Sequence, residues 1–121
     1  MSLNDKKLSS NFHNGIPHWK FQRISAIINM PLIIWFVFSL ITFSDYSYIS
    51  LTEWVKNPIN SILIICMFAS ILYHSSLGIQ VVIEDYVGSE WGRISSIIVV
   101  KAILILLATL SALSLLKIVS I

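Results

Sequence analysis

The stretch that decides the fold runs from Ile59 to Ile83 and reads INSILIICMFASILYHSSLGIQVVI. This apolar run opens after Pro58 and exceeds the roughly 20 mostly apolar residues that a transmembrane helix needs. His74 is therefore expected well inside the hydrocarbon of the membrane, where no water can solvate it. An ionisable residue at that depth indicates a functional site.

Other residues of interest share the helix face that carries His74. Asp85 follows eleven residues later and returns to within about 20° of the same direction, roughly 16 Å further along the axis. Ser70 and Gly78 lie one turn to either side of His74, and small residues let a helix or a flat macrocycle approach the backbone closely. This face therefore predicts a buried ligand in mid-membrane and a polar site at the surface.

The composition indicates an integral membrane protein. Of its 121 residues, 56% are hydrophobic and only 12% are charged, whereas soluble domains carry about 25% charged residues. Three apolar runs without strand-like alternation predict transmembrane helices at residues 24–43, 59–83 and 94–116. The prediction is an all-α membrane protein, one membrane domain over residues 1–121. Because three helices cannot easily enclose a histidine and a substrate alone, we expect a hetero-oligomeric helix bundle.

Several other classes of function are disfavoured by the same sequence. The net charge of +2 is small and dispersed, so nucleic acid is not an expected partner. Cys66 lies inside the second span and is interpreted as a small apolar residue. The polar segment 1–17 lacks the apolar core of a signal peptide. We expect Gly15 and Pro17 to break any helix in that segment, and His13 and His18 to be surface residues.

The first span begins with polar residues. Arg23 at the membrane edge has two open interpretations: an interfacial anchor, or a planar fork suited to a carboxylate such as a haem propionate. Ser25 and Asn29, four residues apart, share a face and are expected to turn toward the bundle interior. Pro31 removes one backbone hydrogen bond and is expected to kink the helix.

The distribution of lysine and arginine predicts the orientation. Four basic residues precede the first span, whereas the first loop offers only Lys56; the second loop adds Arg93 and the carboxyl end adds Lys117. By the positive-inside rule, the amino terminus and the Glu84–Arg93 loop face the cytoplasm or matrix. Arg23 and the pair Asp85 and Tyr86 are then expected at the same membrane surface.

His74 itself has two interpretations from residue chemistry. It is an axial ligand of haem iron, with the second ligand supplied by another chain, or a histidine hydrogen-bonded to a neighbouring helix. No other histidine lies in a predicted span, and a zinc site would need three or four ligands. Glu84 is interpreted as a solvated helix end. By contrast, Tyr86 can donate a hydrogen bond to a quinone carbonyl while Asp85 supplies or relays protons.

Two motifs resemble a known family. Trp19-x-x-Gln22-Arg23-x-Ser25-Ala26, followed by His74-x-x-x-Gly78 and then Asp85-Tyr86-Val87, is similar to the smaller hydrophobic membrane anchor of succinate dehydrogenase, respiratory complex II. The resemblance spans His18 to about Val87. It implies that His74 is an axial ligand of haem b, that Tyr86 binds ubiquinone with Asp85 beside it, and that Arg23 lies near the haem propionates.

The resemblance also implies partners and a location. The other haem ligand would come from a second membrane-anchor subunit, and an iron–sulphur subunit would dock beneath the flavoprotein subunit that oxidises succinate. The membrane would be the bacterial or mitochondrial inner membrane. Two alternatives stay open: a non-enzymatic three-span scaffold or assembly protein, and the anchor of a related quinol:fumarate reductase.

Overall fold

A computed structural model describes the backbone of residues 3–121 and the side chains of residues 17–121. Over this range the backbone forms four helices and no strand, which confirms the predicted all-α class. The helices are α1 (Leu3–Ile41), α2 (Tyr48–Lys56), α3 (Pro58–Tyr86) and α4 (Glu90–Ser120). The side chain of His13 lies outside the described residues.

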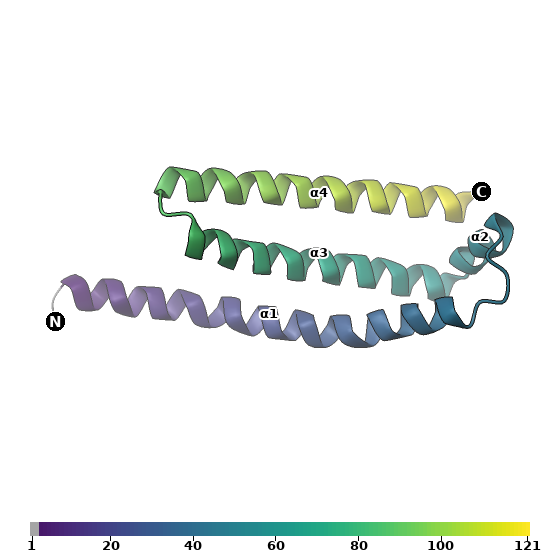
Figure 1. The fold of residues 1–121 in the computed structure, drawn as a ribbon, viewed down its shortest axis with the longest axis horizontal. Coiled ribbons are helices and arrows are strands. Elements are labelled where there is room, and N and C mark those ends of the chain that lie inside the picture. The colour runs from purple at the N-terminus through teal and green to yellow at the C-terminus, as the bar shows by residue number, and fades with distance from the viewer. Residues whose placement is uncertain (1–2) are drawn as a thin grey trace.

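The three long helices form a row with α3 in the middle (Figure 1). Helix α3 packs against α1 on one side and α4 on the other, while α1 and α4 make no backbone contact with each other in the described range. Short α2 contacts α3 and α4 at the end of the bundle that holds the carboxyl terminus. Because α3 is the central element, residues on its α1-facing side lie between two helices.

Local capping explains where α3 and α4 begin. The side chain of Asn57 accepts a hydrogen bond from the backbone nitrogen of Ile59, and Pro58 occupies the first turn of α3. There the missing donor of a proline costs little. Ser89 caps α4 by accepting from the backbone nitrogen of Gly92 at 3.2 Å. This cap starts α4 at Glu90, four residues before the predicted boundary at residue 94.

Helix α1 departs from one prediction. It continues through Pro17 and Pro31, so the predicted helix break at Gly15 and Pro17 is wrong. Proline fixes φ at a value that a helix accepts and removes only one backbone hydrogen bond, so a long helix can include it at a local cost. Figure 1 shows α1 bowed along its length, in keeping with the bend expected near Pro31.

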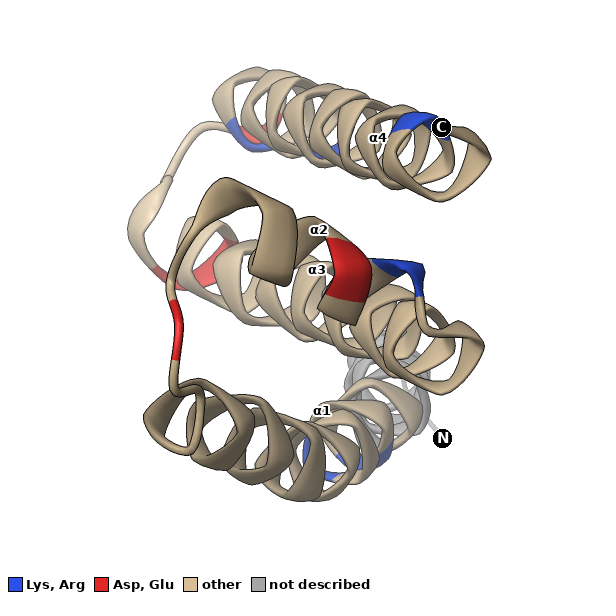
Figure 2. Cartoon of the chain, turned by 90° about the vertical axis from the view of Figure 1, so that its right-hand side faces the viewer, with Lys and Arg blue, Asp and Glu red and all other residues tan. Residues whose placement is uncertain are grey.

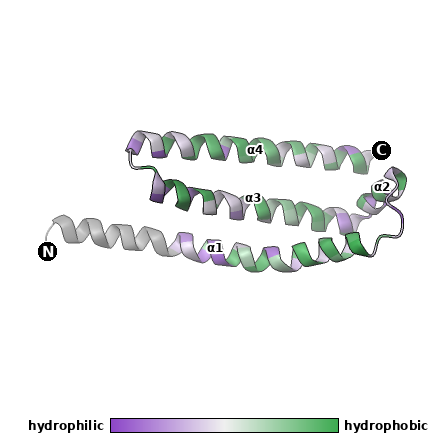
Figure 3. Cartoon of the chain, in the orientation of Figure 1, coloured by the Kyte–Doolittle hydropathy of each residue, from purple (hydrophilic) through white to green (hydrophobic). Residues whose placement is uncertain are grey.

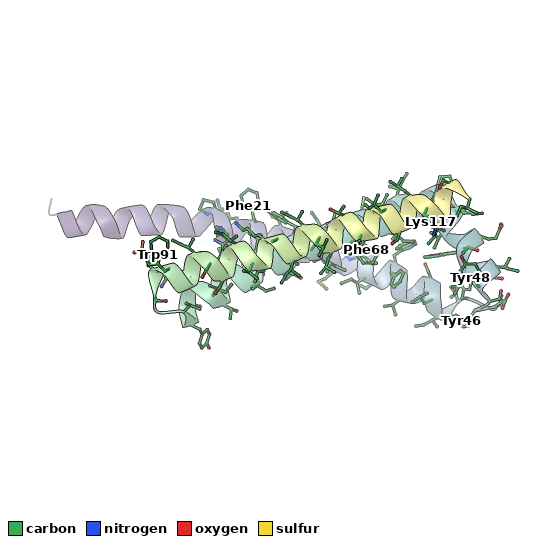
Figure 4. The ribbon with its side chains drawn as sticks, turned by 90° about the horizontal axis from the view of Figure 1, so that it is seen from above. Phe21, Tyr46, Tyr48, Phe68, Trp91 and Lys117 are labelled. Carbon is green, nitrogen blue, oxygen red and sulfur yellow. The ribbon has the colours of Figure 1, made fainter. Side chains whose placement is uncertain are left out.

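The surface of the bundle is that of a membrane protein. Three helical segments, Pro17–Ile41, Pro58–Tyr86 and Glu90–Ser120, are long and apolar enough to cross a membrane. Hydrophobic residues predominate along their middle parts (Figure 3), and charged residues lie mainly in α2, the loops and the helix ends (Figure 2). Exposed aromatic residues stand at both ends: Phe21 and Trp91 at one, Tyr46 and Tyr48 at the other (Figure 4). Aromatic residues at these positions suit the headgroup layers.

Helix α2 is attached by aromatic packing. The ring of Trp54 stacks on Trp35 of α1, with 5.8 Å between ring centroids, and meets Phe43 edge-on. The segment between the first two spans therefore contains a helix docked on the bundle. It closes the end of the bundle farther from His74.

Few of the described side chains are buried, and half of those few are polar. Within the described side chains the buried apolar residues are Ile64, Met67 and Ile83, and the buried polar residues are Ser25, Asn29 and Ser61. Ser25 and Asn29 thus turn inward, as predicted from their spacing. A polar group buried among apolar helices must find hydrogen-bond partners, and the partner of Ser25 is His74.

Candidate functional site

The site is built around the imidazole of His74, which lies half-buried between α3 and α1. Its Nδ1 is 2.9 Å from the hydroxyl oxygen of Ser25. Its Nε2 is 3.5 Å from the amide nitrogen of Gln22. Both neighbours belong to α1, so the ring joins the two helices through its two nitrogens.

Ser25 is the most enclosed member of this group. Its side chain is only 4% exposed, and its hydroxyl donates to the backbone carbonyl of Gln22 at 2.9 Å. Serine commonly bonds its own helix in this way, one turn back. The oxygen of Ser25 is therefore fixed by its own helix before it meets the imidazole.

Gly78 allows Gln22 to reach the site. A Cβ added at Gly78 would lie 3.2 Å from the amide nitrogen of Gln22, closer than ordinary van der Waals contact. The close approach that the small residue predicted is confirmed, with Gln22 as the group that approaches. Ser70, the other small residue of this face, is half-buried.

Sequence reasoning did not identify Gln22 as part of the site. A usable signal exists, because Gln22, Ser25 and Asn29 recur at i, i+3 and i+7, which is one face of a helix. Three polar residues on one face of an otherwise apolar span mark the side that turns toward another helix. Two acceptors on this face, Gln22 Oε1 and Asn29 Oδ1, are buried and make no hydrogen bond with any of the described side chains or backbone.

Arg23 points away from the imidazole. It is exposed, and its guanidinium carbon lies 4.4 Å from the ring centroid of Trp19, a cation–π contact. Such a pair is worth about 0.5–1 kcal/mol when exposed and fixes the direction of the arginine head. His18, one residue before Trp19, is half-buried.

Asp85 and Tyr86 occupy the last turn of α3. Both are exposed, and Tyr86 is 85% exposed, so its hydroxyl is open to an incoming molecule. Neighbouring Glu84 accepts a hydrogen bond from Gln80 at 2.9 Å, as a solvated helix end would. Tyr86 lies about 18 Å along the helix axis from His74, at 1.5 Å per residue.

The contact between α1 and α3 gives the position of Arg23 relative to Asp85 along the bundle axis. Gln22 stands opposite Gly78, and Asp85 is seven residues further along α3, or roughly 10 Å. Arg23 therefore lies about two turns deeper in the bundle than Asp85. Both belong to the same half of the bundle, but this structure does not bring them into contact.

A second hollow opens on the surface of the bundle and extends from beneath α2 as far as Leu72, two residues before His74. An apolar cavity of about 660 Å³ lies beneath α2, lined by residues of all four helices, among them Phe36, Trp54, Phe68 and Leu115. No ionisable side chain lines it. The chemistry of the described residues is therefore concentrated around His74 and at the end of α3.

The donor set around His74 limits what it can hold. No group of three or more histidine, cysteine, aspartate or glutamate residues gathers within the described part of the chain. A zinc site needs such a group. The His74 imidazole has Nδ1 bonded to Ser25 and Nε2 facing the side-chain amide of Gln22. A single imidazole of this kind suits a metal whose other ligands come from outside the described residues.

Comparison with known proteins gives a matching family and several similar proteins. The family described as "Succinate dehydrogenase/Fumarate reductase transmembrane subunit" matches residues 2–112. The chain is 37% identical over 101 residues to the succinate dehydrogenase hydrophobic membrane anchor subunit of Rickettsia bellii, covering 83% of this chain and 80% of the relative. The corresponding protein of Rickettsia typhi is 34% identical with the same coverage. The succinate dehydrogenase membrane anchor subunit of Reclinomonas americana is 33% identical over 96 residues, covering 76% of this chain and 79% of the relative.

Proposed function

The chain belongs to the family of succinate dehydrogenase membrane-anchor subunits, and from this premise we propose its part in the complex. It is an integral membrane protein that holds the flavoprotein and iron–sulphur subunits at the membrane together with a second membrane-anchor subunit. It contributes one axial ligand of a shared haem b, His74. It also forms part of the site where ubiquinone is reduced, through Tyr86 and Asp85.

The observation that carries this proposal is the imidazole of His74 between two membrane-spanning helices. Its Nδ1 is held by Ser25, and iron-ligating histidines are oriented in this way by a bond to the other ring nitrogen. Its Nε2 faces the end of a flexible glutamine, which can turn aside. The residues therefore fit a single axial ligand, and bound haem b would supply a one-electron redox centre inside the membrane.

Arg23 and Trp19 support the same assignment from the helix surface. The cation–π contact directs the guanidinium outward from α1, on the turn that carries Gln22 and Ser25. A guanidinium pairs with a carboxylate through two parallel hydrogen bonds. In the assembled complex Arg23 would neutralise a haem propionate.

The end of α3 supports the quinone assignment. The hydroxyl of Tyr86 is open to solvent or lipid headgroups, and a phenol there can donate to a quinone carbonyl. Asp85, adjacent and exposed, can supply or relay the protons that quinone reduction consumes. Lipid-soluble ubiquinone would enter from the membrane next to this turn.

We also propose that the amino terminus faces the cytoplasm or matrix, because Lys6, Lys7, Lys20 and Arg23 cluster before the first span. Two membrane crossings then return the Glu84–Arg93 loop to the same side. In a Cys66→Ala background, cysteines introduced at Ser89 and Ser47 should react with impermeant reagents from opposite sides of the membrane. Labelling of both positions from one side would contradict the three-span topology.

The main test replaces His74 with leucine in the purified four-subunit complex. Loss of the ligand should remove or strongly alter the haem band of the reduced-minus-oxidised spectrum. Tyr73→Leu, at the adjacent and largely exposed position, is the matched control and should keep the band. A complex that assembles with His74→Leu and shows an unchanged haem band would exclude His74 as the ligand and favour a scaffold role.

The substitution Tyr86→Phe tests whether Tyr86 binds quinone or has only a structural role at the end of α3. The change removes one neutral hydrogen bond worth about 0.5–1.5 kcal/mol, so succinate–quinone reductase activity should fall roughly two- to twelvefold. Succinate oxidation with a soluble dye that accepts electrons upstream should persist, as should haem content. Tyr73→Phe is the control. Equal loss of both activities would assign Tyr86 to docking of the iron–sulphur subunit instead.

A quinol:fumarate reductase anchor is the second candidate, because the matching family includes both enzymes. The two reactions use the same kind of anchor and run in opposite directions. The direction depends on the potential of the quinone and on the partner subunits. The ratio of succinate oxidation to fumarate reduction by the purified complex distinguishes them.

A further inference from the structure

The hydrogen bonds of Ser25 determine which nitrogen of His74 carries the proton. A serine hydroxyl has one proton to donate and can accept through its lone pairs. The Ser25 oxygen lies 2.9 Å from the backbone carbonyl of Gln22 and 2.9 Å from Nδ1 of His74. A carbonyl oxygen can only accept, so the hydroxyl proton goes to it. The Ser25 oxygen must then accept from Nδ1, which carries a hydrogen.

The second contact of the ring agrees with this assignment. The amide nitrogen of Gln22, which can only donate, faces Nε2 of His74 at 3.5 Å. A donor facing Nε2 requires a lone pair on that nitrogen. The Ser25 bonds thus specify the tautomer with Nδ1 protonated and Nε2 free to bind a metal, and the longer Gln22 contact is compatible with it.

We propose that Ser25 is a positioning residue that holds His74 in its metal-binding tautomer and orients Nε2. This inference rests on the proposed function of His74 as a haem ligand. When iron occupies Nε2, the Gln22 amide must turn away, while the bond from Nδ1 to Ser25 can remain. Because Ser25 is 4% exposed, water does not replace the bond if it is lost.

The bond should also tune the iron. A hydrogen bond accepted from Nδ1–H raises the basicity of the ligand, which favours ferric over ferrous iron. Its removal should raise the midpoint potential of the haem and weaken haem binding. Loss of a bond of this kind typically weakens metal affinity about 10- to 100-fold.

The test uses the purified complex with Ser25→Ala, Ser25→Thr and a control, Ser39→Ala. Ser39 also lies on α1 and also donates to its own helix, to the carbonyl of Trp35 at 2.8 Å. Ser25→Ala should shift the haem potential upward and speed haem transfer to apomyoglobin by about tenfold or more. Ser25→Thr should restore both values, because a threonine hydroxyl can make the same bonds in a helix. Ser39→Ala should leave both unchanged.

The outcomes separate this inference from the proposed function. If Ser25→Ala matches Ser39→Ala in potential and haem retention, while His74→Leu loses the haem, Ser25 has no positioning role and His74 is still the ligand. If the His74→Leu complex keeps its haem band, the proposed role of His74 as the haem ligand is contradicted, and the inference about Ser25 falls with it. Should Ser25→Ala not assemble, Ser25→Cys keeps the volume with a weaker acceptor and should shift the potential in the same direction. An unchanged potential in Ser25→Cys would overturn the proposal.

Discussion

Two hydrogen-bonded groups of three residues stand at different places in this molecule. One consists of Gln22, Ser25 and His74, between α1 and α3. The other consists of Asp45, Ser47 and Ser50 at the start of α2, where Ser47 and Ser50 both donate to the Asp45 carboxylate. The first contains one serine hydroxyl and the second contains two, all at ordinary hydrogen-bond distances, but only the first group is enclosed by helices.

The contrast shows how burial changes the role of similar bonds. At the start of α2, water can replace any bond that is lost, so the group mainly decides where a short helix begins. Between α1 and α3, a buried polar group that loses its partner costs about 1–3 kcal/mol, so the bonds of Ser25 to His74 and to the Gln22 carbonyl are strongly favoured over arrangements that break them. The buried group can therefore hold an imidazole in one orientation and one tautomer, whereas the exposed group has no such constraint.

The largest effect is expected from Gly78→Leu, which places a large side chain against the buried group of Gln22, Ser25 and His74. A Cβ at this position already lies 3.2 Å from the Gln22 amide nitrogen, so a leucine must displace Gln22 or separate α1 from α3. Overpacking of this kind costs about 1–3 kcal/mol. We expect reduced yield of assembled complex and loss of haem, measured by size-exclusion chromatography and by the haem spectrum.

Gly88→Leu is the matched control. A Cβ at Gly88 meets no atom within 4 Å, and its backbone does not need the left-handed conformation that favours glycine. It should assemble normally. Equal damage from both substitutions would mean that leucine harms the chain regardless of position, and that the Gln22 contact is not special.

The sequence predicted the fold well because the membrane imposes a simple rule. Long apolar runs must form helices there, and the three predicted spans are helical, except that α1 ends at Ile41, two residues before the predicted end of the first span. The inward face of Ser25 and Asn29 followed from a spacing of four residues. The boundaries were less accurate, since the Ser89 cap starts α4 at Glu90, before the apolar run. Pro17 was predicted to end a helix, but a proline alone does not decide that.

The site was predicted only in part, for a different physical reason. His74, Asp85 and Tyr86 were identified because ionisable and phenolic groups are unusual in or beside a span. Their neighbours depend on the register between α1 and α3, which no local pattern specifies. The Ser25–His74 bond joins residues 49 positions apart, and Gln22 entered the prediction only as part of a motif.

A smaller effect is expected from Ser47→Ala in the exposed group. Ser47 caps α2 by accepting from the backbone nitrogen of Ser50 at 3.3 Å. Loss of an N-cap costs about 0.5–2 kcal/mol, and the exposed position favours the lower end. Amide exchange in the first turn of α2 should quicken, while the haem spectrum stays unchanged. Ser44→Ala, in the same exposed loop, is the control. A change in the haem spectrum would show that the two groups are coupled.

The smallest effect concerns pH and the carboxylate of Asp45. The pKa of Asp45 is lowered from its ordinary value of 3.8, chiefly by the Ser50 hydroxyl at 2.5 Å and next by the Ser47 hydroxyl at 2.7 Å. A lowered pKa means that the charged form is favoured in the folded chain. Its contribution to stability is therefore present above pH 3.8 and is lost as the pH falls through the lowered pKa.

Because this carboxylate is fully exposed, solvent screens the interaction and the loss should be slight. The start of α2 should be insensitive to pH near neutrality and loosen only in acid below the ordinary aspartate range. The pKa can be followed by the chemical shift of the Asp45 carboxyl carbon in micelles. Ser50→Ala removes the largest cause and should move that pKa back toward 3.8, whereas Ser95→Ala, on exposed α4, should not. A titration midpoint unaffected by Ser50→Ala would show that the exposed bonds do not persist in solution, which would sharpen the contrast with the enclosed bonds of Ser25.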